Sequence, residues 1–323
     1  MKLSRFSFST AALLAALKIA GFESNAAACS VCGCSLSSDW AAQGYQSRAG
    51  FQTAIRYEYY DQSQLRSGTG EVDRASLTFP NDDEVQQDTI NRNLWLDLNY
   101  VTNQHWGIEA QIPYYNRSHT TIAEGDTDIS SSHASGMGDI RLLGRWQTSS
   151  MSDGWSVQAG LKLPTGRFNQ DFATGPQAGE LLDRGLQLGT GTTDALVGIS
   201  YFIRPTTNWS YFAQVIGQRA LDSRDGFRPG SSLNVNLGIR RLTTGWLTPQ
   251  LQLNARWDAR ETGPEADYEN SGDFVLDVSP GLTADINMRS SAFVFVQLPV
   301  FQKVNGLQLE PKVVVSIGFR FSL

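Results

Sequence analysis

The sequence predicts an all-β fold, an antiparallel transmembrane β-barrel of about twelve strands, and three observations predict it. Apolar and polar residues alternate in segment after segment of residues 49–323, with the two-residue period of a strand. The connections between these segments are alternately long and short, as in outer-membrane barrels, which have long extracellular loops and short periplasmic turns. Tryptophan and tyrosine collect at the segment ends, where a membrane meets water.

Composition sets the broad class. The chain has 323 residues, which one barrel domain can account for, and a formal net charge of −6. With a sequence pI of about 5.1 and no basic run, nucleic acid is excluded as an expected partner. After the N-terminus no apolar run approaches the roughly 18 residues of a membrane-spanning helix. A membrane location therefore depends on the strands.

The N-terminus has the pattern of an export signal. Lys2 and Arg5 precede the apolar run AALLAALKIA, and the small residues Ala26, Ala27 and Ala28 follow it. Residues 1–28 are accordingly predicted to be a signal peptide that is removed on export. Residues 29–48 are then expected to form a cysteine-containing segment in the oxidising periplasm, and residues 49–323 the barrel.

The expected strands share one pattern, in which apolar side chains at alternate positions face lipid and polar ones face the lumen. In chain order they cover residues 51–60, 94–100, 106–114, 140–146, 155–163, 195–203, 209–215, 233–239, 251–257, 274–284, 292–301 and 308–323. Long polar loops are expected at 61–89, 117–136 and 165–193, and short connections at 102–105, 149–154, 204–208, 243–245 and 302–306. An even strand number places both chain ends in the periplasm. Residues 292–301 are apolar at both odd and even positions, so the sequence does not decide which of them face lipid and which face the lumen.

Residues 308–323 are expected to close the barrel. Their apolar residues, Leu309 among them, alternate outward as far as Leu323, which replaces the aromatic residue usual at this position. Their expected neighbour is the first strand, 51–60, because only their pairing removes the open edges of the sheet. Lys312 would then face the lumen.

Aromatic residues predict two girdles at the membrane boundaries. The predicted periplasmic girdle consists of Tyr100, Trp106, Trp146, Trp155, Tyr201 and Trp209, with Trp246 one step off the parity. The opposite girdle consists of Tyr57, Tyr59, Tyr114, Trp257 and Phe274.

Charges of both signs fall on the inward positions. They are Arg56, Glu58, Asp97, Glu109, Arg141, Arg145, Lys162, Arg240, Arg256, Asp258, Asp277, Asp285, Lys312 and Arg320. Burying so many charges without water or partners would be prohibitive, so they are predicted to line the lumen. Two interpretations stay open: a narrow barrel with a paired interior that conducts little, and a wider channel with selectivity set by its charges.

Two short motifs carry a family resemblance. The segments LKLPTGRF and LQLGTGTTDALVGISYF resemble those of the outer-membrane barrels grouped as the MetA-pathway phenol-degradation family. The matching residues are Pro164, Thr165, Gly166, Gly189, Gly191 and Asp194. The resemblance implies an outer-membrane barrel that transports small compounds, aromatic ones among them. From the residues themselves, structural closure of the loop and ligand binding both stay open.

Three cysteines, Cys29, Cys32 and Cys34, lie together in CSVCGCS, outside the family pattern. A disulfide is favoured by the oxidising compartment. The C-x-x-C-x-C spacing also suits a soft ion such as copper(I), or thiol exchange. A third interpretation has Cys29 lipidated, which leaves Cys32 and Cys34 to pair.

An enzyme is not expected, although one histidine–serine pair has the spacing of a catalytic motif. His133 and Ser135 form an H-x-S similar to that of barrel phospholipases, which need a nucleophilic serine, a histidine base and an orienting group. Where such enzymes place an asparagine, this chain has Gln147. His105 and His119 fall in a turn and a loop, where solvent exposure is expected.

The function predicted from the sequence is an outer-membrane channel or transporter for a small solute, aromatic or metal-related. The alternative is a redox or metal-handling protein that works through the cysteines, with a periplasmic redox or metal-carrier protein as partner. Outer-membrane lipid and the barrel-assembly machinery are the other expected partners.

Overall fold

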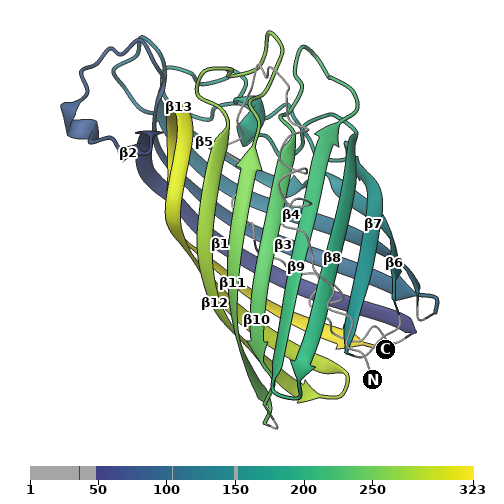
Figure 1. Ribbon diagram of the computed structural model, residues 1–323. Helices are drawn as coiled ribbons and strands as arrows, with labels where there is room; N and C mark the ends of the chain where they lie inside the picture. Colours follow the sequence, from purple (N-terminus) through teal and green to yellow (C-terminus); the bar gives the residue numbers. More distant parts are fainter. Residues whose placement is uncertain (1–35, 37–48, 104, 149–151, 244) are drawn as a thin grey trace, which may run out of the picture.

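The computed structural model describes residues 36, 49–103, 105–148, 152–243 and 245–323, which form a tilted β-barrel (Figure 1). Its strands are β1 (Gly50–Gly68), β2 (Gly70–Glu71), β3 (Val85–Val101), β4 (Trp106–Ile122), β5 (Ser130–Met137), β6 (Ile140–Gln147), β7 (Asp153–Leu163), β8 (Asp194–Thr206), β9 (Trp209–Ala220), β10 (Ser232–Arg241), β11 (Leu247–Asp258), β12 (Asp273–Asn287) and β13 (Ser290–Ser322). The 3₁₀ helices η2 (Arg74–Ser76) and η3 (Arg184–Leu186) lie in connections. Within these residues no helix is long and apolar enough to cross a membrane.

Eleven strands form one closed antiparallel barrel, while β2 and β5 pair outside the ring. Neighbours along the chain are neighbours in the wall, and β1 completes the ring by pairing with β13. In that seam Arg56 lies opposite Gly318 and Glu58 opposite Ser316. The predicted partnership between the first and the closing strand is confirmed, and it leaves the ring without an open edge.

The long strand β13 pairs with two different neighbours. Residues 290–304 pair with β12, and residues 307–322 pair with β1, antiparallel in both cases. Between them Gly306 has φ +54°, a left-handed conformation that glycine adopts without strain. At the ends of the two halves that lie farthest from Gly306, the amide of Ser322 donates to the carbonyl of Arg289 (2.8 Å). The chain therefore reverses at residues 305–306.

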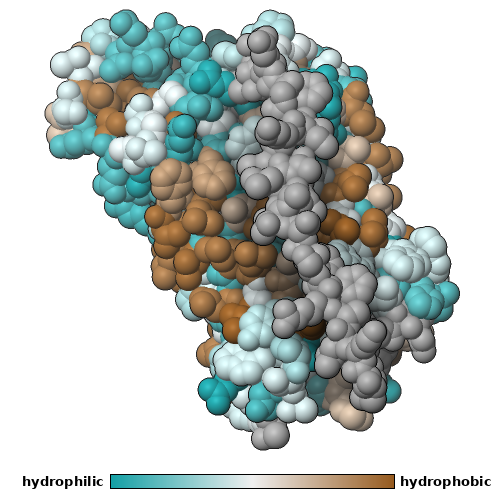
Figure 2. All heavy atoms as spheres, viewed as in Figure 1, coloured by the Kyte–Doolittle hydropathy of each residue, from teal (hydrophilic) through white to brown (hydrophobic). Residues whose placement is uncertain are grey.

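The outer face of the barrel is apolar in the middle. Ile108, Val197 and Ile317 expose 59, 60 and 53% of their surface, although each is flanked by buried or half-buried neighbours. Figure 2 shows the result on one side of the molecule, an apolar band between two hydrophilic ends. Such a band on a closed barrel is the surface that meets lipid.

Connections differ at the two ends of the barrel. At one end, called here the turn end, the strands are joined by residues 102–105, 148–152, 207–208, 242–246 and 288–289. At the other, the loop end, they are joined by 69–84, 123–129, 164–193, 221–231 and 259–272. The carboxyl end of the chain lies at the turn end (Figure 1). The alternation of long and short connections is thus as the sequence predicted, and the turn of β13 at 305–306 departs from it.

Two predicted loops are largely strand. β1 continues to Gly68 and β3 begins at Val85, within the expected loop 61–89. In the expected loop 117–136, β4 continues to Ile122, and β5 pairs with it as an extension beyond β6. Beyond the apolar band both faces of a strand meet water or polar loops, so the hydrophobic alternation that reveals a strand disappears.

The facing of the closing segments is settled by the structure. Phe293 and Phe295 are buried inside, while Val294 and Leu298 are exposed outside. Leu309 was predicted to face lipid, and this is wrong. It is buried with Leu65 and Val85 at the loop end, because register shifts between β1 and β13 interrupt the alternation there.

Candidate functional site

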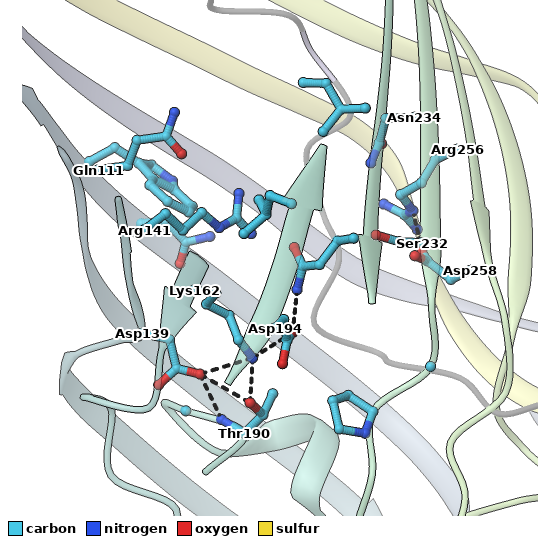
Figure 3. Close-up of a pocket in the computed structure, with 18 of the residues that line it drawn as sticks. Gln111, Asp139, Arg141, Lys162, Thr190, Asp194, Ser232, Asn234, Arg256 and Asp258 are labelled. Atoms are coloured by element: carbon cyan, nitrogen blue, oxygen red, sulfur yellow. Dashed lines mark hydrogen bonds and ion pairs between the residues drawn. The ribbon is translucent and has the colours of Figure 1, made fainter. Parts of the chain in front are cut away.

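The interior of the barrel holds a cavity of about 280 Å³. Strands β1, β3, β4, β6, β7, β8, β9, β10 and β11 contribute side chains to it, and part of the loop 164–193 covers it. Most of the residues that line it are polar, with Gln111, Asn234 and Ser232 beside charged residues (Figure 3). Apolar side chains such as Leu143 and Leu196 lie among them. A polar lumen inside an apolar outer band is the arrangement that an aqueous path through a membrane requires.

Each carboxylate that lines the cavity has a cationic partner. Glu58 contacts Arg56 at 2.6 Å, and Asp258 contacts Arg256 at 2.7 Å. Glu109 contacts Arg145 at 2.8 Å. Asp139 and Asp194 share one cation, described below. Because such close pairs offset much of the cost of removing charges from bulk water, the interior can hold them without being wide.

Lys162 of β7 joins the wall to the long loop. Its ammonium lies 2.9 Å from Asp194 and 3.2 Å from Asp139, and all three side chains are buried. It also hydrogen-bonds to the hydroxyl of Thr190 (Figure 3). Gln218 donates to Asp194 at 2.6 Å, so this carboxylate is held from two sides.

Asp139 is the residue around which the family-motif loop is organised. Its carboxylate accepts from the backbone amides of Gly166 (2.9 Å) and Thr190 (3.0 Å), one from each half of the loop. Thr165 adds a hydroxyl bond to the carbonyl of Gly138 at 2.9 Å. The sequence reasoning did not identify Asp139. In the sequence, only its position between Gly138 and the start of a strand distinguishes it.

The motif glycines permit two backbone segments to touch. A Cβ at Gly166 would lie 2.7 Å from the carbonyl of Leu188, and a Cβ at Gly189 would lie 2.6 Å from both Asp139 and Gly166. Gly191 has φ +74°, which favours glycine for its conformation. Pro164 ends β7 at the point where the loop begins. The motif residues therefore form a structural closure, and Asp194 and Thr190 also line the cavity.

Arg117 holds the same loop from β4, the strand on the other side of β6 from β7. This arginine of β4 is 2% exposed, and it was placed in a loop by the sequence prediction. Its guanidinium donates to Asn91 at 2.7 Å and to the carbonyl of Leu186 at 2.8 Å. Because Leu186 ends η3, the positive charge lies at the carbonyl end of that short helix. Loop 164–193 is thus fastened to β4 as well as to β6 and β7.

Two acidic groups lie close together at η3, with Asp183 partly exposed to solvent and Glu84 half-buried. Asp183 and Glu84 hydrogen-bond to each other, and burial, with Glu84 as a second cause, raises the pKa of Asp183 to about 8. Burial likewise raises the pKa of Glu84. His119, expected to be solvated, is 1% exposed and lies 3.9 Å from Glu84. The strand extension of β4 explains this correction, because it carries His119 under the loop.

The turn end of the lumen is filled by aromatic rings. Phe293 and Phe295 of β13 pack with Leu36. A Cβ at Gly281 would lie 2.1 Å from the ring of Phe295, and one at Gly318 would lie 2.2 Å from the ring of Phe293. The glycines therefore leave room for the rings to lie flat on the wall. Leu36 also lines the cavity, so a residue that precedes β1 lies inside the barrel.

The structure places the predicted lumen residues at different degrees of burial. Buried in the wall are Arg56, Glu58, Asp97, Glu109, Lys162, Arg240, Arg256, Asp258 and Asp277, and partly buried are Arg141, Arg145 and Arg320. Asp285 continues the inward parity of β12 but is exposed, close to the turn 288–289. Lys312 is exposed beside exposed Val313, where the register of β13 shifts. Seven of the fourteen predicted residues line the cavity, namely Arg56, Glu58, Glu109, Arg141, Lys162, Arg256 and Asp258.

The remaining sequence candidates do not converge on the cavity. His133 and Ser135 are exposed on β5, and His133 hydrogen-bonds to Ser118 of β4 at 3.2 Å. Cys29, Cys32 and Cys34 lie outside the described residues. Within the described ranges, no group of three or more His, Cys, Asp or Glu side chains could hold a metal ion.

Comparison with solved structures relates the fold to outer-membrane β-barrels. An outer membrane channel from Pseudomonas putida F1 is similar with a TM-score of 0.65 at 12% identity, over 86% of this chain and 97% of the channel. The toluene transporter TbuX from Ralstonia pickettii has a TM-score of 0.46 at 8% identity, over 86% and 90% of the two chains. The KdgM porin has a TM-score of 0.39 at 10% identity, over 84% and 99%.

The fold is therefore that of an outer-membrane β-barrel. No protein-family model matches the sequence, and no curated protein matches it. The family suggested by the Pro164 and Gly189 motifs therefore stays a prediction.

Proposed function

We propose that the protein is an outer-membrane channel that admits a small solute through the lumen. One observation carries the proposal: a closed barrel with an apolar outer band encloses a polar cavity of about 280 Å³, in which every lining carboxylate is paired. A structural membrane anchor has no need of a polar interior space. Similarity to an outer membrane channel supports the fold on which this function depends.

We infer that the wall has twelve strands. Antiparallel neighbours alternate in direction, so a closed antiparallel ring needs an even number of members. The eleven ring elements meet this condition when the two halves of β13 count separately. Both ends of the barrel chain then lie together, as the bond from the Leu323 amide to the Phe51 carbonyl (2.9 Å) supports.

The orientation follows from the connections. We assign the turn end to the periplasm and the loop end to the outside of the cell, because outer-membrane barrels have short periplasmic turns. Residues 1–28 act as the removed signal peptide, and residues 29–48 as the segment that precedes the barrel. Outer-membrane lipid covers the apolar band.

The barrel-assembly machinery is the partner that inserts the closing strand. Deleting residues 318–323 removes the pairing partners of residues 52–56 and opens the seam. We expect the truncated chain to stay out of the membrane, which membrane fractionation and heat-modifiable migration measure. Normal assembly of the truncated chain would contradict this role.

The interior favours a channel of low conductance. Loop 164–193 lines the cavity at one end, Leu36, which packs against Phe293 and Phe295, lines it as well, and its carboxylates are engaged with cations. Of the two interpretations left open by the sequence, the narrow barrel with a paired interior fits this arrangement.

Planar-bilayer recording tests the channel. The purified full chain is expected to give small, discrete conductance steps that heat-denatured protein does not give. Swelling of liposomes that contain the protein, in small neutral solutes, provides the control for uncharged permeants. A folded barrel with neither conductance nor solute flux would contradict the proposal.

A second candidate function is redox or metal handling through Cys29, Cys32 and Cys34. It is favoured by the position of Leu36, only two residues after Cys34, in the lumen. Such a protein would hold copper(I) or exchange thiols with a periplasmic carrier. The variant C32S/C34S tests it: loss of bound copper or of carrier binding is expected, whereas unchanged copper content and carrier binding would reject this function.

A further inference from the structure

Arg141 differs from the other cations that line the cavity. Arg56, Lys162 and Arg256 contact carboxylates, and Arg184 donates to the carbonyls of Thr190 and Arg224. Among the described residues, no hydrogen bond or ion pair engages the guanidinium of Arg141. Its five N–H donors are therefore available to a ligand in the cavity.

A tryptophan holds Arg141 in place without using those donors. The guanidinium carbon lies 5.5 Å from the centre of the Trp95 ring, within the range of a cation–π contact. Trp95 is itself fixed, because its indole N–H donates to Glu58 at 2.9 Å. Arg141 is thus positioned before any ligand arrives, which lowers the entropic cost of binding.

On the row of the wall that holds Arg141, the nearest carboxylates are Asp97 and Asp194, each two strands away. Lys162 lies between Arg141 and Asp194 and contacts Asp194 itself. Cross-strand pairing places Asp97 opposite Gln111 and Gln111 opposite Arg141, so two strand spacings separate the charges. At about 4.8 Å for each spacing, this backbone separation is about 10 Å. Asp97 attracts Arg141 across this distance but makes no contact that would occupy its donors.

An apolar part of the cavity wall adjoins Arg141 on the turn side. Leu143 follows on the same face of β6, and the next row of the wall pairs Leu143 with Gly160 and Gly160 with Leu196. Both leucines are buried and line the cavity, and Gly160 lies between them with a backbone that approaches β6 so closely that a Cβ would be 2.0 Å from the carbonyl of Leu142. A cation therefore lies beside a small apolar surface.

The geometry points to a subsite for a small organic acid, with the carboxylate on Arg141 and the apolar body on Leu143 and Leu196. The inference deepens the proposed channel function and rests on it, because the acid would be the solute that passes. Arginine suits this ligand because its planar donors match both oxygens of a carboxylate. A cavity of about 280 Å³ accommodates an acid of the size of benzoate.

Isothermal titration of the purified full chain in detergent tests the subsite, with benzoate and its neutral isostere benzamide as probes. Benzoate is expected to bind at least tenfold more tightly than benzamide. The variant R141Q should lose at least tenfold in benzoate affinity while its affinity for benzamide stays the same. The benzoate affinity of R141K should fall between those of the unmodified chain and R141Q, because an ammonium cannot bind both carboxylate oxygens in the geometry of a guanidinium.

Arg241→Gln is the matched control. Arg241 also lies over a tryptophan, 5.7 Å from the centre of the Trp209 ring, but it is exposed on the next residue of β10 after the inward Arg240. R241Q should bind benzoate as the unmodified chain does. Heat-modifiable migration confirms that each variant is folded.

Three outcomes would overturn the subsite: no benzoate binding, equal binding of benzoate and benzamide, or R141Q binding benzoate as tightly as the unmodified chain. The channel is tested separately in bilayers. Benzoate binding that depends on Arg141 without any conductance or flux would keep the subsite and reject the channel. Conductance with no Arg141-dependent binding of benzoate would keep the channel and reject the subsite.

Discussion

The two ends of the lumen are closed in different ways. At the loop end the closure is polar, with Lys162 between Asp139 and Asp194 and with the guanidinium of Arg117 on the carbonyl of Leu186. At the turn end it is apolar, with phenylalanine rings packed on glycines. Ion pairs and hydrogen bonds break and form again in water, whereas a ring against a glycine has only one close-packed position. The comparison indicates that the loop end can open and that the turn end is a fixed constriction.

The largest expected effect comes from breaking the polar closure. Lys162→Met leaves two buried carboxylates without their shared cation, which is expected to destabilise the fold by about 3–5 kcal/mol. The loop should detach from the wall, so single-channel conductance should rise while the barrel stays in the membrane. Urea unfolding and bilayer recording measure the two effects.

Lys303→Met is the control for Lys162, because Lys303 is exposed on the outside of β13. It should change neither stability nor conductance. If K162M conducted like K303M, loop 164–193 would not be the moving closure, and the comparison between the two ends would fail.

The second effect concerns the apolar closure. Gly281→Ala introduces a Cβ that would lie 2.1 Å from the ring of Phe295, and overpacking of this kind costs about 1–3 kcal/mol. Gly217→Ala is the matched control, because its Cβ would meet only a carbonyl at 3.9 Å. Urea unfolding should show a loss for G281A and little change for G217A. Equal stabilities would mean that the ring moves freely, against a fixed constriction.

A third effect is the pH dependence of the loop. Burial raises the pKa of Asp183 to about 8, from 3.8 in an unfolded chain, so the packed loop binds a proton that the released loop gives up. Packing is therefore strongest near pH 4, weakens as the pH rises to about 8, and changes no further above it. Because Asp183 is partly exposed, solvent screens the effect, so the change stays well below the one-proton limit of about tenfold per pH unit.

Hydrogen exchange of residues 164–193 between pH 5 and pH 9, corrected for intrinsic rates, measures this weakening. The groups that face Asp183 are Glu84, His119 and Asp267. Asp183→Asn should flatten the profile above pH 5. If hydrogen exchange in D183N kept the full pH dependence of the unmodified chain, the effect would be assigned to Glu84.

The smallest effect is expected away from both closures. His133→Ala and Ser135→Ala alter exposed side chains on β5, so each should change the free energy of unfolding by less than about 0.5 kcal/mol. Conductance should also stay the same. Loss of a lipid-hydrolysing activity in both variants would instead restore the enzyme hypothesis, and a phospholipid cleavage assay decides this.

Sequence reasoning succeeded where physics ties a residue's chemistry to its surroundings. In the lipid band, one face must be apolar, so the parity of residues such as Ile108 and Ile317 could be predicted, along with the inward facing of Glu58 and Arg256. The pairing of β1 with β13 followed from the need to remove open edges.

The same reasoning failed at the loop end. There strands pass between polar surroundings on both sides, so nothing in the pattern distinguished the strand that carries Arg117 and His119 from a loop. Asp139 gave no signal either, because its role comes from backbone amides of Gly166 and Thr190 that only the folded loop brings to it. Register shifts in β13, which local pattern does not reveal, misplaced Leu309 and Lys312.

The position of Leu36 constrains the order of assembly. This residue precedes β1 in the chain, yet it packs inside the wall against Phe293 and Phe295, which belong to the last strand. Once β1 and β13 pair, the ring has no gap through which a side chain can enter from the side. Leu36 must therefore be in place when the seam forms or enter through an open end of the barrel. A residue near the start of the chain thus occupies space that the wall encloses only when its first and last strands meet.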